Sequence, residues 1–352
     1  MTFILSLIVV IGLVVFVHEL GHFLAAKSVG IRVERFSIGF PPKMVGKKIG
    51  ETEYCISWIP LGGYVKMAGM IDETSNKETS SLTGAPWEFQ SKPTWAKLLA
   101  ITGGVLMNFF FAFLIYTFVI GVRGIGEPGP AVVGAVHSGL PAEEAGFEAG
   151  DRIVSIEGQS IEGWEDLVAI IHNRAEQETQ ITVQRDDETF QITATPRKGQ
   201  VPVDGDFKEV GLLGIEAEPV FRSVGPLEAI SAGWQSTAGA FKIVITSIRL
   251  LVSGKASVKD LSGPIGIAKM SAQAAESGAL SLLAFVAFIS INIGFLNILP
   301  IPALDGGHLL VVLWEGLTRR PLSTRVKLAI QQVGMVLLLA LMVLIIINDL
   351  TK

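Results

Sequence analysis

The 352-residue chain has little of three kinds of residue, and each scarcity excludes a class of protein. A single cysteine, Cys55, excludes an internal disulfide framework and a cysteine-rich zinc or iron–sulfur site. Charged residues make up only 17% of the chain, against about 25% in soluble domains. The net charge of −5 gives no basic footprint and disfavours a nucleic-acid partner. With only five histidines, any metal site has to combine histidine with carboxylates.

Hydrophobic residues are abundant instead, at 49% of the chain with a mean hydropathy of +0.51. A helix needs about 20 mostly apolar residues to cross a bilayer. Four runs meet that length, at about Phe3–Ala26, Leu98–Val122, Leu280–Leu299 and Leu328–Ile347. The sequence therefore predicts a polytopic α-helical membrane protein with four transmembrane helices.

Lysine and arginine near the ends of these runs predict their orientation, because cytoplasmic loops are enriched in both residues. The segment between the first two runs and the segment between the last two carry such clusters: Lys27, Arg32, Arg35, Lys43, Lys47, Lys48, Lys92 and Lys97, then Arg319, Arg320, Arg325 and Lys327. We expect both segments to be cytoplasmic. Both termini and the region from about 123 to 279 are then extracytoplasmic.

Within that outer region, Pro226–Val252 resembles a fifth span in length but not in composition. It contains several serines and threonines as well as Lys242 and Arg249. We expect an amphipathic helix on the membrane surface, not a transmembrane helix.

The first part of the outer region has the pattern of a small α+β module. Its expected elements are a strand at Ala131–His137, a short helix through Ala145, a strand at Arg152–Glu157, a helix at Gly163–His172, and strands at Gln180–Arg185 and Thr189–Ala194. The segment SGLPAEEAGFEAGDRIVSIEGQSI within it resembles PDZ domains. Another small α+β domain is the alternative.

The first cytoplasmic segment is expected to form β-structure that is apolar enough to lie in the membrane interface. The expected strands are Val33–Ile38, Thr52–Trp58 and Tyr64–Met67, with breaks at Pro41-Pro42 and Gly62-Gly63. The polar run Asp72–Ser81 is expected to be a flexible exit from this sheet.

The strongest chemical signal is His18-Glu19-Leu20-Gly21-His22, inside the first apolar run. On a helix, His18 and His22 lie four residues apart on one face, so both imidazoles can bind one ion. Glu19 can then take a proton from a water molecule that Zn²⁺ has acidified. Ionisable groups on an apolar helix are costly and mark functional sites. A polar contact between helices is the alternative.

A catalytic zinc needs a third protein ligand, and Asn297–His308, NILPIPALDGGH, offers the best one. Pro300 and Pro302 should break the helix, and Gly306-Gly307 should keep the chain irregular. Irregular backbone at membrane depth is tolerated where it lines a cavity. Asp305 is the preferred third ligand; His308 is a rival and Glu315 a weaker one. Alternatively, Asp305 caps the following helix.

The predicted topology places these ligands at one depth. With four spans, the first and third both run from outside to inside, so His18, His22 and Asp305 all lie towards the cytoplasmic side. A fifth span at Pro226–Val252 would put Asp305 across the bilayer from His22. The zinc hypothesis and the surface-helix interpretation therefore support each other.

These features together resemble the site-2 protease family, the M50-type intramembrane zinc metalloproteases. The likeness rests on HExxH near the start, a distant NxxPxPxLDGG, four spans and one PDZ-like module. Further similar segments are PLGGYVKMAG, GGVLMNF and LSGPIGIAK. The resemblance covers the whole chain. It is strongest to the bacterial branch that includes the regulator-of-sigma-E protease, whose members cut anti-sigma factors and remnant signal peptides.

The resemblance implies roles for particular residues. His18, His22 and Asp305 would bind zinc, Glu19 would be the general base, and Asn297 would help hold the substrate. The Tyr54–Met67 region would be a membrane-associated hairpin that receives an unwound substrate by strand addition. The PDZ module would exclude substrates with a bulky outer portion. Single-pass membrane proteins would be cut in the bacterial inner membrane.

The expected domains follow from this organisation: 1–122 with HExxH, 123–219 as the PDZ domain, 220–279 as surface helix and connector, and 280–352 with the LDG motif. Two features depart from the family. This chain has room for one PDZ module where the branch often has two. GGVLMN replaces the usual GPxxN, which leaves the role of Asn108 open.

Two other functions compete with the protease. A catalytically silent PDZ scaffold is disfavoured because Glu19, the base, is intact. A metal transporter is disfavoured because the other spans lack intramembrane acidic residues and histidines.

Overall fold

The computed structural model describes residues 2–70, 83–127, 129–203, 206–255, 257, 263–320 and 322–351. The expected flexible exit at Asp72–Ser81 and the first two residues of LSGPIGIAK lie outside the described residues. The chain divides into two compact units. The first comprises residues 1–119, 230–245 and 257–352, and the second comprises 120–229 and 246–256.

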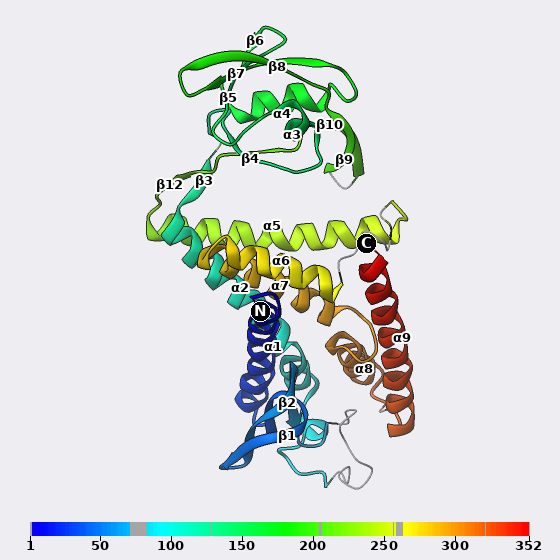
Figure 1. Cartoon of the computed structure of the whole chain (residues 1–352). Coiled ribbons are helices and arrows are strands. Elements are labelled where there is room, and N and C mark those ends of the chain that lie inside the picture. The colour runs from blue at the N-terminus through cyan, green and yellow to red at the C-terminus, as the bar shows by residue number, and fades with distance from the viewer. Residues whose placement is uncertain are drawn as a thin grey trace. The chain divides into compact units, whose positions relative to one another are not determined.

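The first unit is mainly helical (Figure 1). Its helices are α1 (Thr2–Ser28), the short η1 (Phe89–Ser91), α2 (Thr94–Arg123), the middle of α5 (Pro226–Val252), α6 (Pro264–Glu276), α7 (Ala279–Ile298), α8 (Asp305–Thr318) and α9 (Thr324–Thr351). Among the described residues, α1, α2, α7 and α9 are long and apolar enough to cross a membrane, so each of the four predicted runs forms one such helix. Helix α5 is not one of these four. Its position on the membrane surface stays a prediction.

Helix α6 was not identified from the sequence, and it is a central packing element of the first unit. It packs against α1, α7 and α9. On the α1 side, the hydroxyls of Ser6 and Ser271 form a buried hydrogen bond of 3.0 Å. On the α9 side, the Asp349 carboxylate accepts hydrogen bonds from the backbone N–H groups of Gly263, Ile265 and Gly266. An acidic side chain from one helix thus satisfies the otherwise unpaired donors at the start of another.

The β-structure beside these helices is one long hairpin, β1 (Val33–Ile49) and β2 (Thr52–Met67). The three expected strand regions are present, but both expected breaks lie within strands, so the predicted breaks were wrong. The pairing passes from Phe40–Ile59 to Lys43–Ser57, so neither proline has to supply a ladder hydrogen bond.

The two glycines of β2 have a packing role. Gly63 pairs with Ile38, and a Cβ at Gly63 would lie 2.8 Å from the carbonyl oxygen of Ser37 and 3.1 Å from Glu19 Cγ. The hairpin also curls, because residues 35–38 of β1 pair with residues 63–66 and with residues 53–56. Glycine at this point allows the strand to approach both its neighbour and α1.

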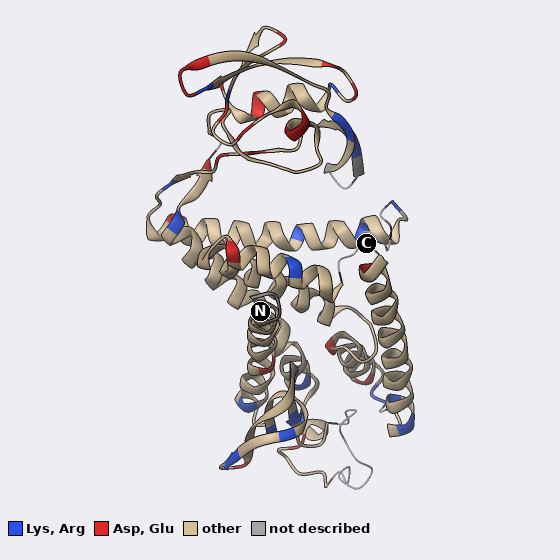
Figure 2. Ribbon diagram, in the orientation of Figure 1, with Lys and Arg blue, Asp and Glu red and all other residues tan. Residues whose placement is uncertain are grey.

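A buried apolar cluster connects the hairpin to the helices. It contains Ala26, Ile31, Val33, Met67, Phe89, Ala100, Ile101 and Val312, from α1, β1, β2, η1, α2 and α8 and the connection after α1. In Figure 2, Lys and Arg gather around the hairpin and at the ends where α1 stops and α9 begins. The hairpin and these helix ends therefore share one polar end of the unit.

The second unit has the α+β pattern expected from the sequence. Its elements are β3 (Ile125–Glu127), β4 (Val133–Val136), α3 (Pro141–Ala145), β5 (Arg152–Ile156), β6 (Gln159–Ser160), α4 (Trp164–His172), β7 (Thr179–Arg185), β8 (Glu188–Ala194), β9 (Arg197–Val203), β10 (Asp206–Leu212), β11 (Ile215–Ala217) and β12 (Val220–Arg222). The predicted elements are confirmed with ends shifted by one or two residues. The hairpin of β9 and β10 was not predicted.

The core of the second unit explains why these segments fold together. The sheet has the order β6-β5-β7-β8, and its alternating apolar residues pack against both helices. Asp151, which directly precedes β5, is fully buried and pairs with Arg185 at 2.6 Å. A buried carboxylate needs such a partner, so this ion pair fixes the turn before β5.

Candidate metal centre

The two histidines of HExxH lie on the face of α1 that packs into the first unit. Both are buried, with exposed fractions of 6% for His18 and 7% for His22. Their ring centroids are 4.7 Å apart and the rings are nearly perpendicular. The helical spacing therefore brings two imidazoles to one point, as the sequence predicted.

The break between α7 and α8 presents the aspartate. Helix α7 ends at Ile298, residues 299–304 are irregular, and Asp305 is the first residue of α8. Ala303 has a left-handed backbone conformation, with φ of 74°. The predicted interruption at the two prolines is confirmed.

The two glycines after Asp305 do not keep the chain irregular, and that expectation was wrong. Gly306 and Gly307 both belong to the first turn of α8. A Cβ on Gly307 would lie 2.6 Å from the carbonyl oxygen of Ile301. A Cβ on Gly306 would clash in the same way with the carbonyl oxygen of Leu299. The glycines are needed because α8 turns back tightly against the end of α7.

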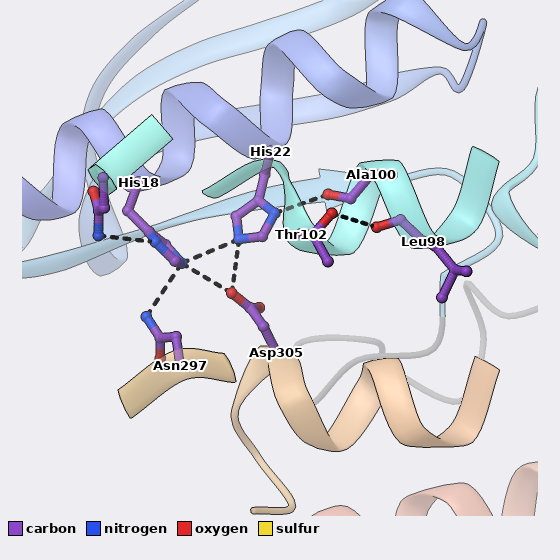
Figure 3. Close-up of polar contacts among 8 residues, drawn as sticks. His18, His22, Leu98, Ala100, Thr102, Asn297 and Asp305 are labelled. Carbon is purple, nitrogen blue, oxygen red and sulfur yellow. Dashed lines mark hydrogen bonds and ion pairs between the residues drawn. The ribbon is translucent and has the colours of Figure 1, made fainter. Parts of the chain in front are cut away.

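Three side-chain atoms from α1 and α8 form an equilateral triangle (Figure 3). The Nε2 atoms of His18 and His22 are 3.1 Å apart, and each lies 3.1 Å from Oδ2 of Asp305. A tetrahedral Zn²⁺ with ligand bonds of about 2.0–2.1 Å separates its ligands by about 3.3–3.4 Å. The donor set of two imidazoles and one carboxylate also suits zinc. These residues therefore fit a zinc ion, which they would hold through two imidazole nitrogens and one carboxylate oxygen.

Helix α2 contacts the far side of both imidazoles. Nδ1 of His22 donates to the backbone carbonyl oxygen of Ala100 at 2.9 Å, which leaves Nε2 available as a ligand. Nδ1 of His18 lies 3.3 Å from Nδ2 of Asn108, a side chain with no exposed surface.

Two adjacent glycines let α2 approach α1 this closely. A Cβ on Gly103 would lie 2.6 Å from the backbone oxygen of Gly21. A Cβ on Gly104 would lie 2.5 Å from Nε2 of His22 and 2.8 Å from Cε1 of His18. The two imidazoles therefore pack directly against the GGVLMN segment of α2. The sequence showed that this segment departs from the family pattern, but it did not predict the contact of the segment with His18 and His22.

Glu19 lies at the edge of a cavity of about 380 Å³ next to the triangle. The cavity is lined by His18, His22, Asp305 and Asn297, together with Gly62, Gly63, Tyr64 and Val65 of β2. Strand β2 approaches Glu19 closely at Gly63, where an added Cβ would lie 3.1 Å from Cγ of Glu19. The hairpin, the carboxylate and the triangle therefore face one space large enough for a peptide segment.

The remaining sequence candidates fall in different places. Asn297 belongs to the site, with Nδ2 3.3 Å from Nε2 of His18. His308 lines the cavity, but its Nε2 accepts a hydrogen bond from Gln331 of α9 at 3.0 Å. Glu315 pairs with Lys327 at 2.7 Å. Among the described residues, the group placed to hold an ion is His18, His22 and Asp305, without either rival.

Comparison with known proteins identifies the chain. The model of "Peptidase family M50" matches residues 6–341. The regulator of sigma-W protease RasP of Bacillus subtilis is 31% identical, with 99% of this chain and 98% of that protein covered. The zinc metalloprotease RasP of Bacillus licheniformis is 30% identical, with 100% and 99% covered. The chain therefore belongs to peptidase family M50, the site-2 protease family, and is a zinc metalloendopeptidase with four helices long enough to cross a membrane.

Proposed function

We propose that this protein is an intramembrane endopeptidase that cuts single-pass membrane proteins in or near their transmembrane helices. In this proposal His18, His22 and Asp305 hold the zinc ion and Glu19 is the general base. The observation that carries it is the triangle of ligand atoms, with sides of 3.1 Å, formed partly by a helix apolar enough to cross a bilayer. A hydrolytic site built into such a helix has its substrates in the membrane.

A Zn²⁺ ion bound to these residues supplies a Lewis acid that polarises the scissile carbonyl and acidifies water. The protein's own side chains transfer the protons and hold the substrate. Glu19 accepts the proton of the attacking water and returns it to the leaving amine. Asn297, whose amide nitrogen lies 3.3 Å from Nε2 of His18, can donate a hydrogen bond to the substrate's carbonyl oxygen.

The position of β2 supports binding of the substrate as an added strand. Residues 63–66 pair with residues 35–38 of β1, and Gly62–Val65 also line the cavity. A helical substrate hides its amides in its own hydrogen bonds, so it has to unwind before cleavage. An extended segment lying along residues 62–65 would then pass directly over Glu19.

The domain organisation and the orientation belong to this proposal. We propose that the 123–219 region is an extracytoplasmic PDZ domain that excludes substrates with a bulky outer portion, and that 220–279 is a surface helix with its connector. The regions 1–122 and 280–352 carry the two halves of the site. The Lys and Arg cluster around the hairpin (Figure 2) favours a cytoplasmic location for this end.

The substrates that we propose are anti-sigma factors or remnant signal peptides in a bacterial inner membrane. The name of the Bacillus subtilis relative, regulator of sigma-W protease, supports the first class. Both proposed classes place an apolar helix in the bilayer, which suits a lateral approach to a buried site.

The test is cleavage of single-span reporters by purified protein in liposomes. A reporter with a short outer tail should be cut, and the same reporter with a folded outer domain should be cut at least about tenfold more slowly. Removal of zinc by a chelator should stop both reactions, and added Zn²⁺ should restore them. A chain lacking 129–219 should cut both reporters at similar rates.

Equal cleavage of both reporters by the full-length chain would remove the proposed filter. Cleavage of a soluble unfolded protein but not of either reporter would contradict an intramembrane substrate. A chelator-resistant reaction would contradict the role given to zinc.

A further inference from the structure

We propose that Asn108 is a positioning residue that holds the His18 imidazole, through Nδ1, in the tautomer and orientation that metal binding requires. This inference rests on the proposed zinc role of His18. It concerns a residue whose role the sequence left open, because GGVLMN departs from the usual family pattern.

A histidine that binds a metal through Nε2 carries its proton on Nδ1, and that N–H needs an acceptor. For His22 the acceptor is the backbone carbonyl oxygen of Ala100, at 2.9 Å. For His18 the group within reach of Nδ1 is the Asn108 amide, at 3.3 Å. Both partners belong to α2, eight residues apart, so one helix supports the two proposed histidine ligands.

The Asn108 amide can serve His18 in either tautomer. With its nitrogen towards His18, Nδ2 donates to an unprotonated Nδ1. A half-turn of the amide exchanges nitrogen and oxygen, and Oδ1 then accepts a hydrogen bond from a protonated Nδ1. The second arrangement leaves the lone pair of Nε2 pointing at the space shared with His22 and Asp305.

The surroundings of Asn108 indicate that this contact is its main polar interaction. The side chain has no exposed surface, and Oδ1 is buried without a hydrogen-bond partner among the described residues. A buried amide costs free energy unless its hydrogen bonds are made. An apolar side chain would fill the same space without this cost, so the amide is expected to act on His18.

The chain provides a matched control for a purely structural role. Ser290 of α7 is also fully buried, and its hydroxyl donates to the backbone carbonyl oxygen of Asn108 at 3.0 Å. Ser290→Ala therefore removes a buried polar contact at the same turn of α2 without touching the imidazole.

The experiment compares the full-length protein with Asn108→Leu, Asn108→Asp and Ser290→Ala in detergent. The readout is the dissociation constant for Zn²⁺, measured by chelator competition. The zinc-dependent rise in Tm is recorded in the same samples. We expect Asn108→Leu to weaken zinc binding by about 10–100-fold, the usual effect of losing a hydrogen-bond partner of a metal-bound histidine. Asn108→Asp supplies an acceptor, so it should bind zinc as tightly as the parent or more tightly.

The zinc-free Tm and the rise in Tm that zinc produces together distinguish a positioning role of Asn108 from a purely structural one. If Asn108 positions His18, Asn108→Leu reduces the rise in Tm that zinc produces, while Ser290→Ala lowers the zinc-free Tm and leaves that rise unchanged. Parental zinc affinity in Asn108→Leu would overturn the proposal. If Asn108→Leu does not fold, a loss of zinc affinity in Asn108→Asp would overturn it. If the parent protein binds no zinc at all, the proposed metal centre itself is wrong, which is a distinguishable result.

Discussion

Glu19→Gln is expected to lower reporter cleavage by about 10²- to 10⁴-fold while the protein keeps its zinc. General-base catalysis contributes a factor of this size. Glutamine keeps the shape of glutamate but cannot accept a proton at neutral pH. Glu19 is outside the triangle of ligand atoms, so zinc binding should not depend on its charge. The measurement is cleavage in liposomes together with the zinc content of the same samples.

The control for this substitution is Glu276→Gln, an exposed glutamate at the end of α6 in the same unit. It changes the net charge equally and should leave cleavage unchanged. Parental activity in Glu19→Gln would contradict the role given to this carboxylate. Loss of zinc together with activity would show that Glu19 acts in metal binding and not as the base.

Gly104→Ala is expected to lower activity by at least about 10²-fold and to weaken zinc binding. The added methyl would lie 2.5 Å from Nε2 of His22 and 2.8 Å from Cε1 of His18, well inside van der Waals contact. Neither imidazole is free to move away, because α2 holds each through Nδ1. Either the rings or the two helices must shift, and a displacement of about 1 Å at a catalytic centre costs about 10²-fold.

Gly121→Ala, near the other end of α2, is the matched control. There the nearest atom to an added Cβ is the Cβ of Ala229, at 3.8 Å, which is ordinary contact. The two variants make the same change to helix propensity, so their difference reports contact with the site. Equal zinc affinity and activity in the two variants would contradict the arrangement of α1 against α2.

The sequence was sufficient where a short-range pattern carries the information. The spacing of His18 and His22 predicted a shared helix face, and the prolines after Asn297 predicted the break that presents Asp305. Apolar runs of about 20 residues predicted the four long helices. In each case, local geometry or the thickness of a bilayer fixes the outcome.

The sequence was not sufficient where the cause is a contact between distant segments. Nothing local to Gly104 indicates that two imidazoles lie against it, since they come from a helix about 80 residues earlier. Gly306 and Gly307 appeared to be chain breakers because glycine disfavours helices, but close packing against the end of α7 requires them. Helix α6 was missed, although Gly263-Pro264 is a helix-start signal that could have identified it.

The central claim is that His18, His22 and Asp305 together bind one zinc ion. The most direct measurement is X-ray absorption at the zinc edge of the purified protein, with zinc stoichiometry measured for the parent and for Asp305→Ala. The account predicts about one zinc per chain, with two histidine nitrogens at about 2.0–2.1 Å and oxygen at about 2.0–2.2 Å, and zinc binding greatly weakened in Asp305→Ala. Sulfur ligation, or an unchanged zinc environment and affinity in Asp305→Ala, would contradict it.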